Sequence, residues 1–435
     1  MPTTNSSPER PREQLLKSSS ALAAAMVLSF CRLATADDAR PAPPAAEAPR
    51  HVNRIEMKGI DRTRESTLLG VLPRPLPTTF TPEELEEYER RVNNLAIFDL
   101  VTIAIEDDVL VVDVREKWTL TPLIDFASGE TLKDTYALLG ASEDNFLGRA
   151  LQLGLEGSYL ERSWNGEVWA EDHPYRTSAL GFELGGGSLG SSFRFDDSES
   201  EWQRRRSGGH LAVKLPNAYG SFLRYEVGIA GYREAVLDRV GVTPASGTYL
   251  HAIGRATLDR YLWNDLVPRG NRVIAEVGPG FFFGPSEQRH YVRLRYLGAL
   301  ALGKTTVVMA NVVGDLLNAG NPNHSALLGT ISGVRGLPDT FYRSNAQAYL
   351  NLELRQSFRI ATRWAIQVVA LTDAAVLRQL DAAGEPTKVI PAVSFGGGGR
   401  IIPTLLSDTL LRVDTAVLAL PHRGSVIQVG LSQYF

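Results

Sequence analysis

The last eleven residues, 425–435, constrain the fold of this chain more than any other segment. Counting back from Phe435 in steps of two gives an apolar-rich face, whereas the intervening positions, such as Gly430, are small or polar. Successive side chains of a strand point to opposite faces, so the segment predicts a strand with one oily and one polar face. A chain end frays unless something holds it, and the closing strand of a membrane barrel has that restraint. A terminal strand in a soluble sheet is the alternative.

Composition excludes some classes of protein. A chain of 435 residues has room for two or more domains, and its net charge of -4 gives no basic footprint for nucleic acid. Outside the N-terminus no uncharged apolar run reaches the length of a membrane-spanning helix. A transmembrane barrel stays possible, because its strands alternate and average out to neutral hydropathy.

Residues 1–36 predict an export signal. A positively charged start is followed by an apolar stretch from Ala21 to Phe30 and by a small-x-small cleavage site at Ala34–Ala36. Residues 37–50 form a Pro/Ala-rich linker without periodicity. The one cysteine, Cys31, lies inside the signal, so the exported chain is expected to carry no thiol and no cysteine-based metal site.

Residues 51–117 predict a small α+β domain. Thr81 to Glu84 form a capping box, with Pro82 at the first helical position, and apolar residues follow at helical spacing. The two strands after this helix alternate and form a hairpin around Asp107 and Asp108. The expected order is strand, helix, helix, strand and strand, over His51–Gly59, Arg64–Leu72, the helix after Thr81, Leu100–Glu106 and Val109–Arg115.

Residues 118–435 predict a barrel. Helical periodicity stops at Trp118, and alternating segments recur between turn residues, with room for about sixteen strands. The clearest segments are Asn345–Arg355, Trp364–Thr372 and Leu411–Val417, each apolar on one side and polar on the other. The predicted fold is therefore mainly β: a transmembrane antiparallel barrel preceded by one small α+β domain. A soluble two-sheet sandwich is the alternative, although its strands would be shorter.

The small domain resembles a POTRA repeat, the periplasmic module of the BamA/TamA-like outer-membrane assembly factors. The resemblance lies in Ile55-x-Met57-x-Gly59, Leu95-x-x-Phe98-Asp99-x-Val101 and Val112-x-Val114-x-Glu116. It implies that an exposed edge strand receives an unfolded client strand by β-augmentation. A generic α+β module is the alternative.

The barrel segments resemble the same family in their order along the chain. They are Gly140-x(4)-Asn145-Phe146-Leu147-Gly148, Leu258-Asp259-Arg260 with Pro268-x-Gly270, Gly333-Val334-Arg335-Gly336-Leu337, Leu371-x-Asp373-x-Ala375, and Gly397-x-Gly399-x-Ile401 with Leu411-Arg412-x-Asp414. The third segment resembles the tip of the long loop that folds back into the lumen of these barrels. The family's aromatic residue three from the end is Gln433 here, and residues 164–201 match less well.

Arg335 is the main candidate site residue. An unpaired guanidinium in a partly dehydrated lumen is costly, so it needs an acidic partner. Asp373 and Glu353 both fall on inward positions of their strands, which predicts a bond from Arg335 to Asp373 with Glu353 as a second acceptor. Gly333 and Gly336 flank Val334 and Arg335 and allow a tight turn against the wall. An exposed loop arginine is the alternative.

The barrel seam is the second candidate site. It is expected between a first strand, Thr119–Ala127, and a last strand that contains Gly430 and ends at Phe435. Pro122 lies in the first strand and has no N–H for a ladder, so the closure is expected to be weak. As a hypothesis, this weakness lets the wall open sideways and template a client strand. Alternatively, Pro122 precedes the strand proper.

The resemblance to the BamA/TamA-like family implies a bacterial outer-membrane protein with its N-terminal domain in the periplasm, which assists the insertion of other barrel proteins. The expected partners are unfolded outer-membrane or secreted polypeptides, the lipid bilayer, and periplasmic chaperones or accessory proteins, but not nucleic acid. A two-partner secretion translocase and a passive porin are the alternatives. No enzyme, cofactor or metal is expected, because the seven histidines lack metal-ligand spacing. A phospholipase with His and Ser on neighbouring strands stays open as an alternative.

Overall fold

The computed structural model describes twelve stretches of the chain. They are residues 48–128, 136–160, 163–173, 179–195, 199–216, 222–262, 266–285, 287–318, 321–329, 333–337, 342–406 and 410–431. The predicted export signal, nearly all of the linker and Phe435 lie outside these stretches. All described residues belong to one compact unit, Ala46–Phe435.

The small domain contains two sheets. In one, β2 (Arg54–Lys58) pairs in parallel with β5 (Val109–Glu116), which pairs antiparallel with β4 (Phe98–Glu106). In the other, β1 (Arg50–Val52) pairs with β3 (Thr78–Phe80), a strand that the sequence pattern did not predict.

The predicted single strand His51–Gly59 is wrong, because the chain divides at Asn53 into two strands with different partners. The Asn53 backbone N–H donates to the Asp108 carbonyl at 2.9 Å, and its side-chain amide donates to the Asp108 carboxylate at 2.7 Å. Both bonds go to the turn between β4 and β5. Side-chain alternation alone carries no sign of this break, since it continues through both strands.

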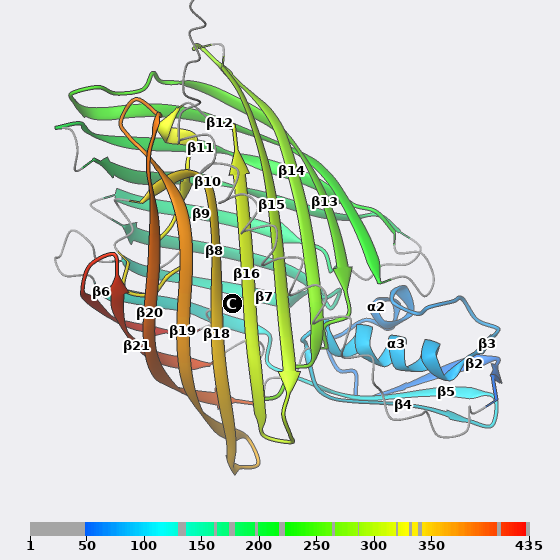
Figure 1. The fold of residues 1–435 in the computed structure, drawn as a ribbon. Coiled ribbons are helices and arrows are strands. Elements are labelled where there is room, and N and C mark those ends of the chain that lie inside the picture. Colours follow the sequence, from blue (N-terminus) through cyan, green and yellow to red (C-terminus); the bar gives the residue numbers. More distant parts are fainter. Residues whose placement is uncertain are drawn as a thin grey trace, which may run out of the picture. The chain divides into compact units, whose positions relative to one another are not determined.

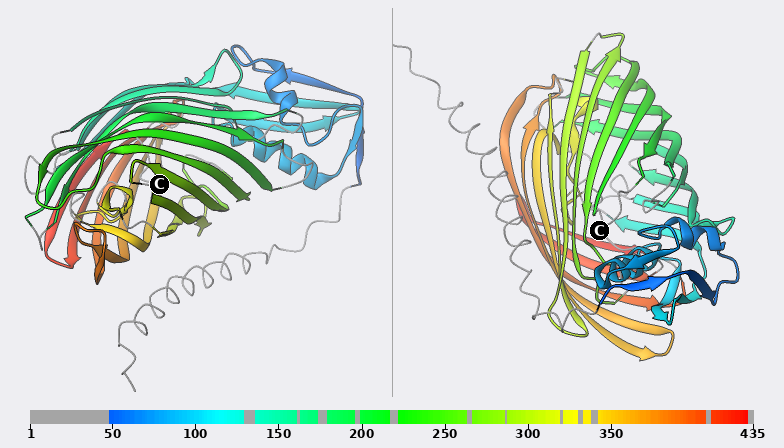
Figure 2. Two further views of the ribbon diagram at one scale, coloured as in Figure 1. Left: turned by 90° about the horizontal axis from the view of Figure 1, so that it is seen from above. Right: turned by 90° about the vertical axis from the view of Figure 1, so that its right-hand side faces the viewer.

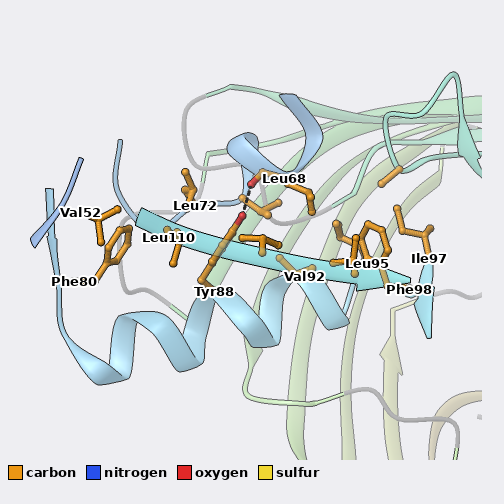
Figure 3. Close-up of a cluster of buried hydrophobic side chains, with 14 of the residues drawn as sticks. Val52, Leu68, Leu72, Phe80, Tyr88, Val92, Leu95, Ile97, Phe98 and Leu110 are labelled. Atoms are coloured by element: carbon orange, nitrogen blue, oxygen red, sulfur yellow. Dashed lines mark hydrogen bonds between the residues drawn. The ribbon is translucent and has the colours of Figure 1, made fainter. Parts of the chain in front are cut away.

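Two helices complete the domain, α2 (Glu65–Gly70) and α3 (Pro82–Asn93). The predicted capping box is confirmed: the Glu84 N–H donates to Thr81 Oγ1 at 3.3 Å, and the Thr81 N–H donates to the Glu84 carboxylate at 3.1 Å. Figure 3 shows the core between helices and sheet, where the Tyr88 hydroxyl of α3 donates to the Leu68 carbonyl of α2 at 3.2 Å. This bond satisfies a buried hydroxyl inside an otherwise apolar cluster.

Glu116 fastens the turn after β2 to the end of β5. Its carboxylate accepts from the backbone N–H groups of Asp61, Arg62 and Thr63 at 3.2, 3.1 and 2.7 Å. Gly59 opens this turn with a φ of 75°, and a Cβ there would overlap the Val114 carbonyl oxygen. Glycine is therefore required by both backbone conformation and space.

Residues from Leu120 onward form a closed antiparallel barrel, in which each strand pairs with the next and β22 returns to β6. Sixteen strands of the described chain make up the wall; Figures 1 and 2 show them as one curved sheet. They are β6 (Leu120–Ser128), β7 (Tyr136–Phe146), β8 (Leu151–Leu160), β9 (Ser163–Glu171), β10 (Gly181–Arg194), β11 (Glu201–Lys214), β12 (Leu223–Val240), β13 (Gly247–Asp259), β14 (Gly270–Phe283), β15 (Glu287–Ala301), β16 (Thr306–Leu317), β18 (Arg343–Ala361), β19 (Trp364–Leu380), β20 (Pro386–Pro403), β21 (Leu411–Leu420) and β22 (Gly424–Gly430).

In its described residues, the long segment between β16 and β18 has two short elements of its own. They are the 3₁₀ turn η2 (Pro322–His324) and the two-residue strand β17 (Ala326–Leu327), which pairs with the start of β18. The described parts of this segment also include Gly333 to Leu337. We refer to residues 321–329 and 333–337 as the lumen loop.

The wall alternates as the sequence predicts, with apolar side chains outward and polar side chains inward. On β19, Trp364, Ile366 and Val368 are exposed on the outer face, whereas Gln367 and Asp373 are buried on the inner face. An apolar exterior around a polar interior is the pattern of a barrel that lies in a bilayer. No helix in the described part of the chain is long and apolar enough to cross a membrane.

Strand lengths differ from the predicted bounds. The segment predicted as Asn345–Arg355 lies inside the longer strand β18, and Trp364–Thr372 is the first half of β19, whereas β22 ends at Gly430. The periodic pattern marks only the part of a strand that lies between an oily and a wet environment. Strand ends beyond that zone lose their alternation, although they keep their hydrogen bonds.

We predict that the Glu116 contact makes the turn at residues 61–63 sensitive to acid. Burial alone would raise the pKa of Glu116, but the hydrogen bonds from Thr63, Arg62 and Asp61 outweigh it, and the net pKa is lowered. The stabilisation is therefore complete above the carboxyl's unfolded pKa of about 4.3, and is lost as pH falls through the lower folded pKa. Hydrogen exchange, corrected for intrinsic rates, should show that protection of these three amides falls in acid. Glu116→Gln should abolish this pH dependence, and exposed Glu106→Gln should keep it; an unchanged profile in Glu116→Gln would contradict the assignment.

Candidate functional site in the barrel lumen and at its seam

The tip of the lumen loop, Gly333–Leu337, lies against the inner wall of the barrel. Val334 and Leu337 are both 0% exposed and belong to a buried apolar cluster with Leu377 of β19 and Leu418 of β21. Gly336 has a φ of 89°, a conformation that favours glycine, so the chain turns tightly at this point. The tip is thus packed as firmly as a protein core.

The structure brings Arg335 and Asp373 together. The Arg335 Nε and Nη2 donate to the two carboxylate oxygens of Asp373 at 2.9 and 2.7 Å, and the Arg335 backbone N–H donates to the same group at 3.0 Å. Glu353 also lies where the sequence places it, and accepts from Arg335 Nη1 at 2.8 Å. Because all three side chains are at most 1% exposed, this is a buried, bidentate ion pair with a second acceptor.

Both acids have further partners on neighbouring strands. Asp373 accepts from the Asn351 side-chain amide at 2.9 Å and from the Ser394 hydroxyl at 3.2 Å. Glu353 accepts from Arg355 Nε and from Arg400 Nη2, each at 2.7 Å. Asn351 also donates to the Gly333 carbonyl at 2.6 Å, so the loop backbone is held as well as its side chain. The network therefore joins the loop tip to β18, β19 and β20.

Electrostatic contacts continue from this network to the barrel seam. Asp414 of β21 lies 3.6 Å from Arg335 Nη1 and 3.6 Å from Arg412 Nη1. Arg412 Nη2 in turn lies 3.5 Å from the carboxylate of Asp125 on β6. These separations are ion pairs rather than short hydrogen bonds. An alternating row of charges thus runs from the loop tip across β21 to the first strand.

Gly398 makes room for this row. A Cβ at Gly398 would overlap the Asp414 carboxylate, whereas a Cβ at the adjacent Gly399 would meet nothing within 4 Å. Arg400 and Ser394 of the same strand point inward, so Gly398 belongs to the inner face and Gly399 to the outer face. In this glycine motif, Gly398 therefore leaves space for Asp414 in the charge network, whereas Gly399 does not contact the network.

The seam between β22 and β6 is short in the part of the chain that the structure describes. Its register has four pairs, from Ile427 opposite Ser128 to Gly430 opposite Asp125. One further bond runs from the Leu431 N–H to the Ile124 carbonyl at 2.7 Å. By contrast, β18 pairs with β19 from Ser344 to Ala361. Within the described residues, fewer pairs therefore join β22 to β6 than join β18 to β19.

Pro122 lies inside β6, so the alternative that it precedes the strand is wrong. Alternate residues of a strand direct their backbone groups to the same side, and the Ile124 carbonyl is bonded to β22. The nitrogen of Pro122 therefore faces the β22 side, where it has no hydrogen to donate. Gly430 lies opposite Asp125 rather than opposite Pro122. The chain that would follow Leu431 opposite Pro122, including Phe435, lies outside the described residues.

Several residues of the site were not identified from the sequence. The alternation along β18 and β21 places Asn351, Arg355 and Arg412 on inward faces, but it does not show which residues they contact. Arg400 and Asp125 were not assigned to an inward face by the sequence analysis. Inward parity counted from Ile401 and from Phe126 would have found both.

Enzyme-like patterns do not assemble into a centre within the described residues. No group of three His, Cys, Asp or Glu side chains in these stretches is placed to hold a metal ion. The sequence contains one match to the G-x-S-x-G pattern of hydrolases, Gly186–Gly190. It lies in the middle of β10, where Ser188 accepts from the Ser207 hydroxyl at 3.0 Å, and not on the strand-to-helix turn that a nucleophile elbow needs.

Comparison with known proteins gives matches in structure only. No protein-family model and no curated protein matches the sequence. BamA from Haemophilus ducreyi, in a form that lacks POTRA domains 1–3, is 15% identical over 88% of this chain and 84% of its own, with a TM-score of 0.50. CdiB from Escherichia coli is 14% identical over 88% of this chain and 76% of its own, with a TM-score of 0.61.

CdiB from Acinetobacter baumannii is a third match, 13% identical over 88% of this chain and 74% of its own, with a TM-score of 0.58. This chain shares the barrel fold of BamA and CdiB. At such low identity the likeness concerns the fold, and it does not separate one activity from another.

We predict that Arg335→Ala strongly destabilises the folded barrel. Removal of one partner leaves Asp373 and Glu353 buried with less positive charge, a change that costs about 3–5 kcal/mol in a buried pair. The temperature at which the compact form converts to the unfolded form on a semi-native gel should therefore fall. Arg363→Ala, at an exposed position in the turn between β18 and β19, is the matched control. Equal transition temperatures for the two variants would show that the buried pair contributes nothing.

Two adjacent glycines provide a separate prediction about the charge row. Gly398→Ala should destabilise the barrel, because its methyl group displaces the Asp414 carboxylate from between Arg335 and Arg412. Gly399→Ala should be tolerated, since its methyl group points to open space on the outer face. Both effects are measured by the same gel transition. If the two variants behave alike, the inner face at Gly398 does not carry the constraint that we assign to it.

Proposed function

We propose that this chain is a bacterial outer-membrane protein that assists the insertion of other β-barrel proteins into that membrane. The barrel would lie in the lipid bilayer, with the N-terminal domain in the periplasm. Unfolded outer-membrane polypeptides would be its clients, delivered by periplasmic chaperones or accessory proteins. The proposal involves no enzymatic step, cofactor, metal or nucleic acid.

The seam is the observation that carries this proposal. A backbone hydrogen bond contributes only about 0.5–1.5 kcal/mol net, so a seam with four register pairs opens at a lower cost than the long strand pairs elsewhere. In lipid, however, unpaired strand edges are costly, and an opened seam needs a replacement strand. A client strand that pairs with β6 or β22 supplies it. The missing N–H of Pro122 further weakens the native pairing on that side.

The small domain supports the same function. The structural match to BamA covers 88% of this chain, whereas residues 118–435 make up about 73% of it, so the match extends into the residues before the barrel. This favours the POTRA assignment. In the described residues β2 is an edge strand, with β5 as its one sheet neighbour, and it is open to β-augmentation. We propose that a client strand first adds to β2.

Secretion of a polypeptide through the barrel is the second candidate. The two CdiB structures have TM-scores of 0.61 and 0.58, above the 0.50 of BamA. A passive porin is less well supported, because it requires neither the small domain nor a buried arginine in the lumen. The difference between the first two candidates lies in the exit: the seam for an insertase and the lumen for a translocase.

Depletion of the protein, followed by a census of outer-membrane and secreted proteins, separates these candidates. Our proposal predicts a broad loss of folded barrel proteins from the outer membrane. Loss of a single secreted polypeptide would instead support a translocase. Altered uptake of small solutes, with both protein censuses unchanged, would support a porin.

We predict that a disulfide across the seam blocks activity. Ala127 on β6 and Gln428 on β22 are directly opposite, and paired positions of antiparallel strands lie within the span of a disulfide. The oxidised Ala127→Cys/Gln428→Cys variant should fail to restore barrel insertion in depleted cells, and a reductant should rescue it. Ala375→Cys/Ala392→Cys, which joins β19 to β20 in the same wall, should be active in both states. Full activity of the oxidised seam variant would exclude lateral opening.

A further inference from the structure

A cavity of about 500 Å³ lies on the inner face of the barrel wall, lined mainly by β11 to β15. The last three of these strands lie side by side, as Figure 1 shows. Lysine or arginine occupies six of the lining positions, and glutamate occupies three. Ligand cavities in proteins have volumes of this order, and the excess of cations favours an anionic ligand.

Arg255 of β13 shows how the wall neutralises a lining cation. It donates to Glu226 and Glu276 at 2.9 Å and to Glu183 at 3.2 Å. A guanidinium with three carboxylates around it has no positive charge left for a ligand. Anion binding in the cavity must therefore come from cations that have fewer acidic neighbours.

Arg295 of β15 is such a cation. Its Nε donates to the side-chain oxygen of Asn311 at 2.9 Å, and the Asn311 amide donates to Asn351 at 2.9 Å. Within the described residues, no carboxylate lies at ion-pair distance from Arg295, and its two Nη groups have no hydrogen-bond partner. A neutral amide orients the guanidinium but does not neutralise it. The wall thus holds a half-buried cation in a fixed direction and leaves its charge uncompensated.

Arg293, two positions earlier on the same face of β15, is held in a similar way. Its Nε donates to Asp315 at 2.6 Å, and Asp315 also accepts from Gln347 at 2.9 Å. The Arg293 side chain is 52% exposed, and its Nη groups have no hydrogen-bond partner among the described residues. Both arginines are therefore fixed to the wall through Nε, and each keeps its Nη donors for the cavity that it lines.

The neighbouring strand β14 leaves these donors accessible. The register places the apolar Ile274 opposite Arg295 and Glu276 opposite Arg293. The two carboxylate oxygens of Glu276 accept from Arg255 at 2.9 Å and from the Tyr291 hydroxyl at 2.8 Å. Glu276 is thus already engaged by other donors, and Ile274 has no side-chain acceptor to offer.

We propose that Arg293 and Arg295 form a binding site for a phosphate group on the inner wall of the barrel. A phosphate group carries up to about two negative charges on three oxygens, so it accepts from both pairs of Nη donors at once. A single carboxylate is saturated by one guanidinium. The bound phosphate supplies the negative charge that the wall withholds from Arg295. This inference does not depend on the barrel acting as an insertase.

Calorimetric titration of the purified full-length protein in phosphatidylcholine nanodiscs tests the site, with inorganic phosphate as the probe and chloride holding the ionic strength constant. We expect one saturable site, and Arg295→Gln should weaken it by about tenfold or more. This variant leaves no carboxylate without a partner, so it should unfold at no lower temperature than the natural protein. Phosphate should raise the unfolding temperature of the natural protein but not that of Arg295→Gln.

Two further variants separate recognition from simple charge attraction. Arg293→Lys/Arg295→Lys keeps both charges but loses the paired Nη donors, and should bind phosphate with intermediate affinity. Arg363→Gln, at an exposed position in the turn between β18 and β19, is the matched control and should bind like the natural protein.

Nanodiscs that contain phosphatidic acid form the second arm, because this lipid headgroup carries the same phosphate group. Binding of inorganic phosphate that depends on Arg295 supports the site with a soluble ligand, which we expect for a cavity on the lumen side of the wall. Enrichment of phosphatidic acid alone, lost in Arg295→Gln, supports the site with a lipid headgroup as its source. Absence of binding in both arms, or equal phosphate affinity of the natural, Arg295→Gln and Arg363→Gln proteins, would overturn the proposal.

Discussion

The burial of one guanidinium constrains the rest of this barrel. Arg335 is removed from water inside the lumen, and such a charge is tolerated only where acids and hydrogen-bond acceptors surround it. The wall supplies Asp373 and Glu353, and it also supplies the cations Arg355 and Arg400 that balance Glu353. A loop that carries such a residue cannot slide along the wall, since each shift would leave a buried charge unpaired. The network thus fixes the register between the loop and four strands.

The same charges connect the loop to the place where the wall is weakest. Asp414 and Arg412 lie between Arg335 and Asp125, and Asp125 belongs to the first strand of the seam. Four register pairs close the barrel there in the described residues, fewer than between β18 and β19, so we expect side-chain electrostatics to contribute a larger share of the closing energy. We infer that the loop tip supports the closed seam from the inside. Release of the loop and opening of the wall would then be linked events.

Much of the wall could be predicted because period-two alternation is a local property of the chain. It identified the inward acids on β18 and β19, since apolar and polar residues alternate along a strand that has one face toward lipid and one toward water. The pairing of Arg335 followed from that parity. The Asn53 break was missed because it depends on Asp108, 55 residues later, and not on its neighbours.

Contacts across the lumen could not be predicted in the same way. The turn η2 is an example: His324 contacts Glu234 of β12, Tyr249 of β13 and Phe282 of β14, and local alternation gives no information on how these strands align with the turn. Asp125 escaped notice for a similar reason, because its partner Arg412 is 287 positions away. Local periodicity shows which side chains face inward, but not which of them meet.

The link between loop tip and seam is tested most directly by amide hydrogen exchange of the full-length protein in lipid, with Asp414→Asn compared with the natural chain. Asp414→Asn keeps the shape of the side chain and removes the charge that joins Arg335 to Arg412. The account predicts faster exchange for the amides of β22 and for residues 124–128 of β6, while β12 to β15 keep their protection. Unchanged exchange at the seam would contradict the coupling, even if the variant lost stability elsewhere.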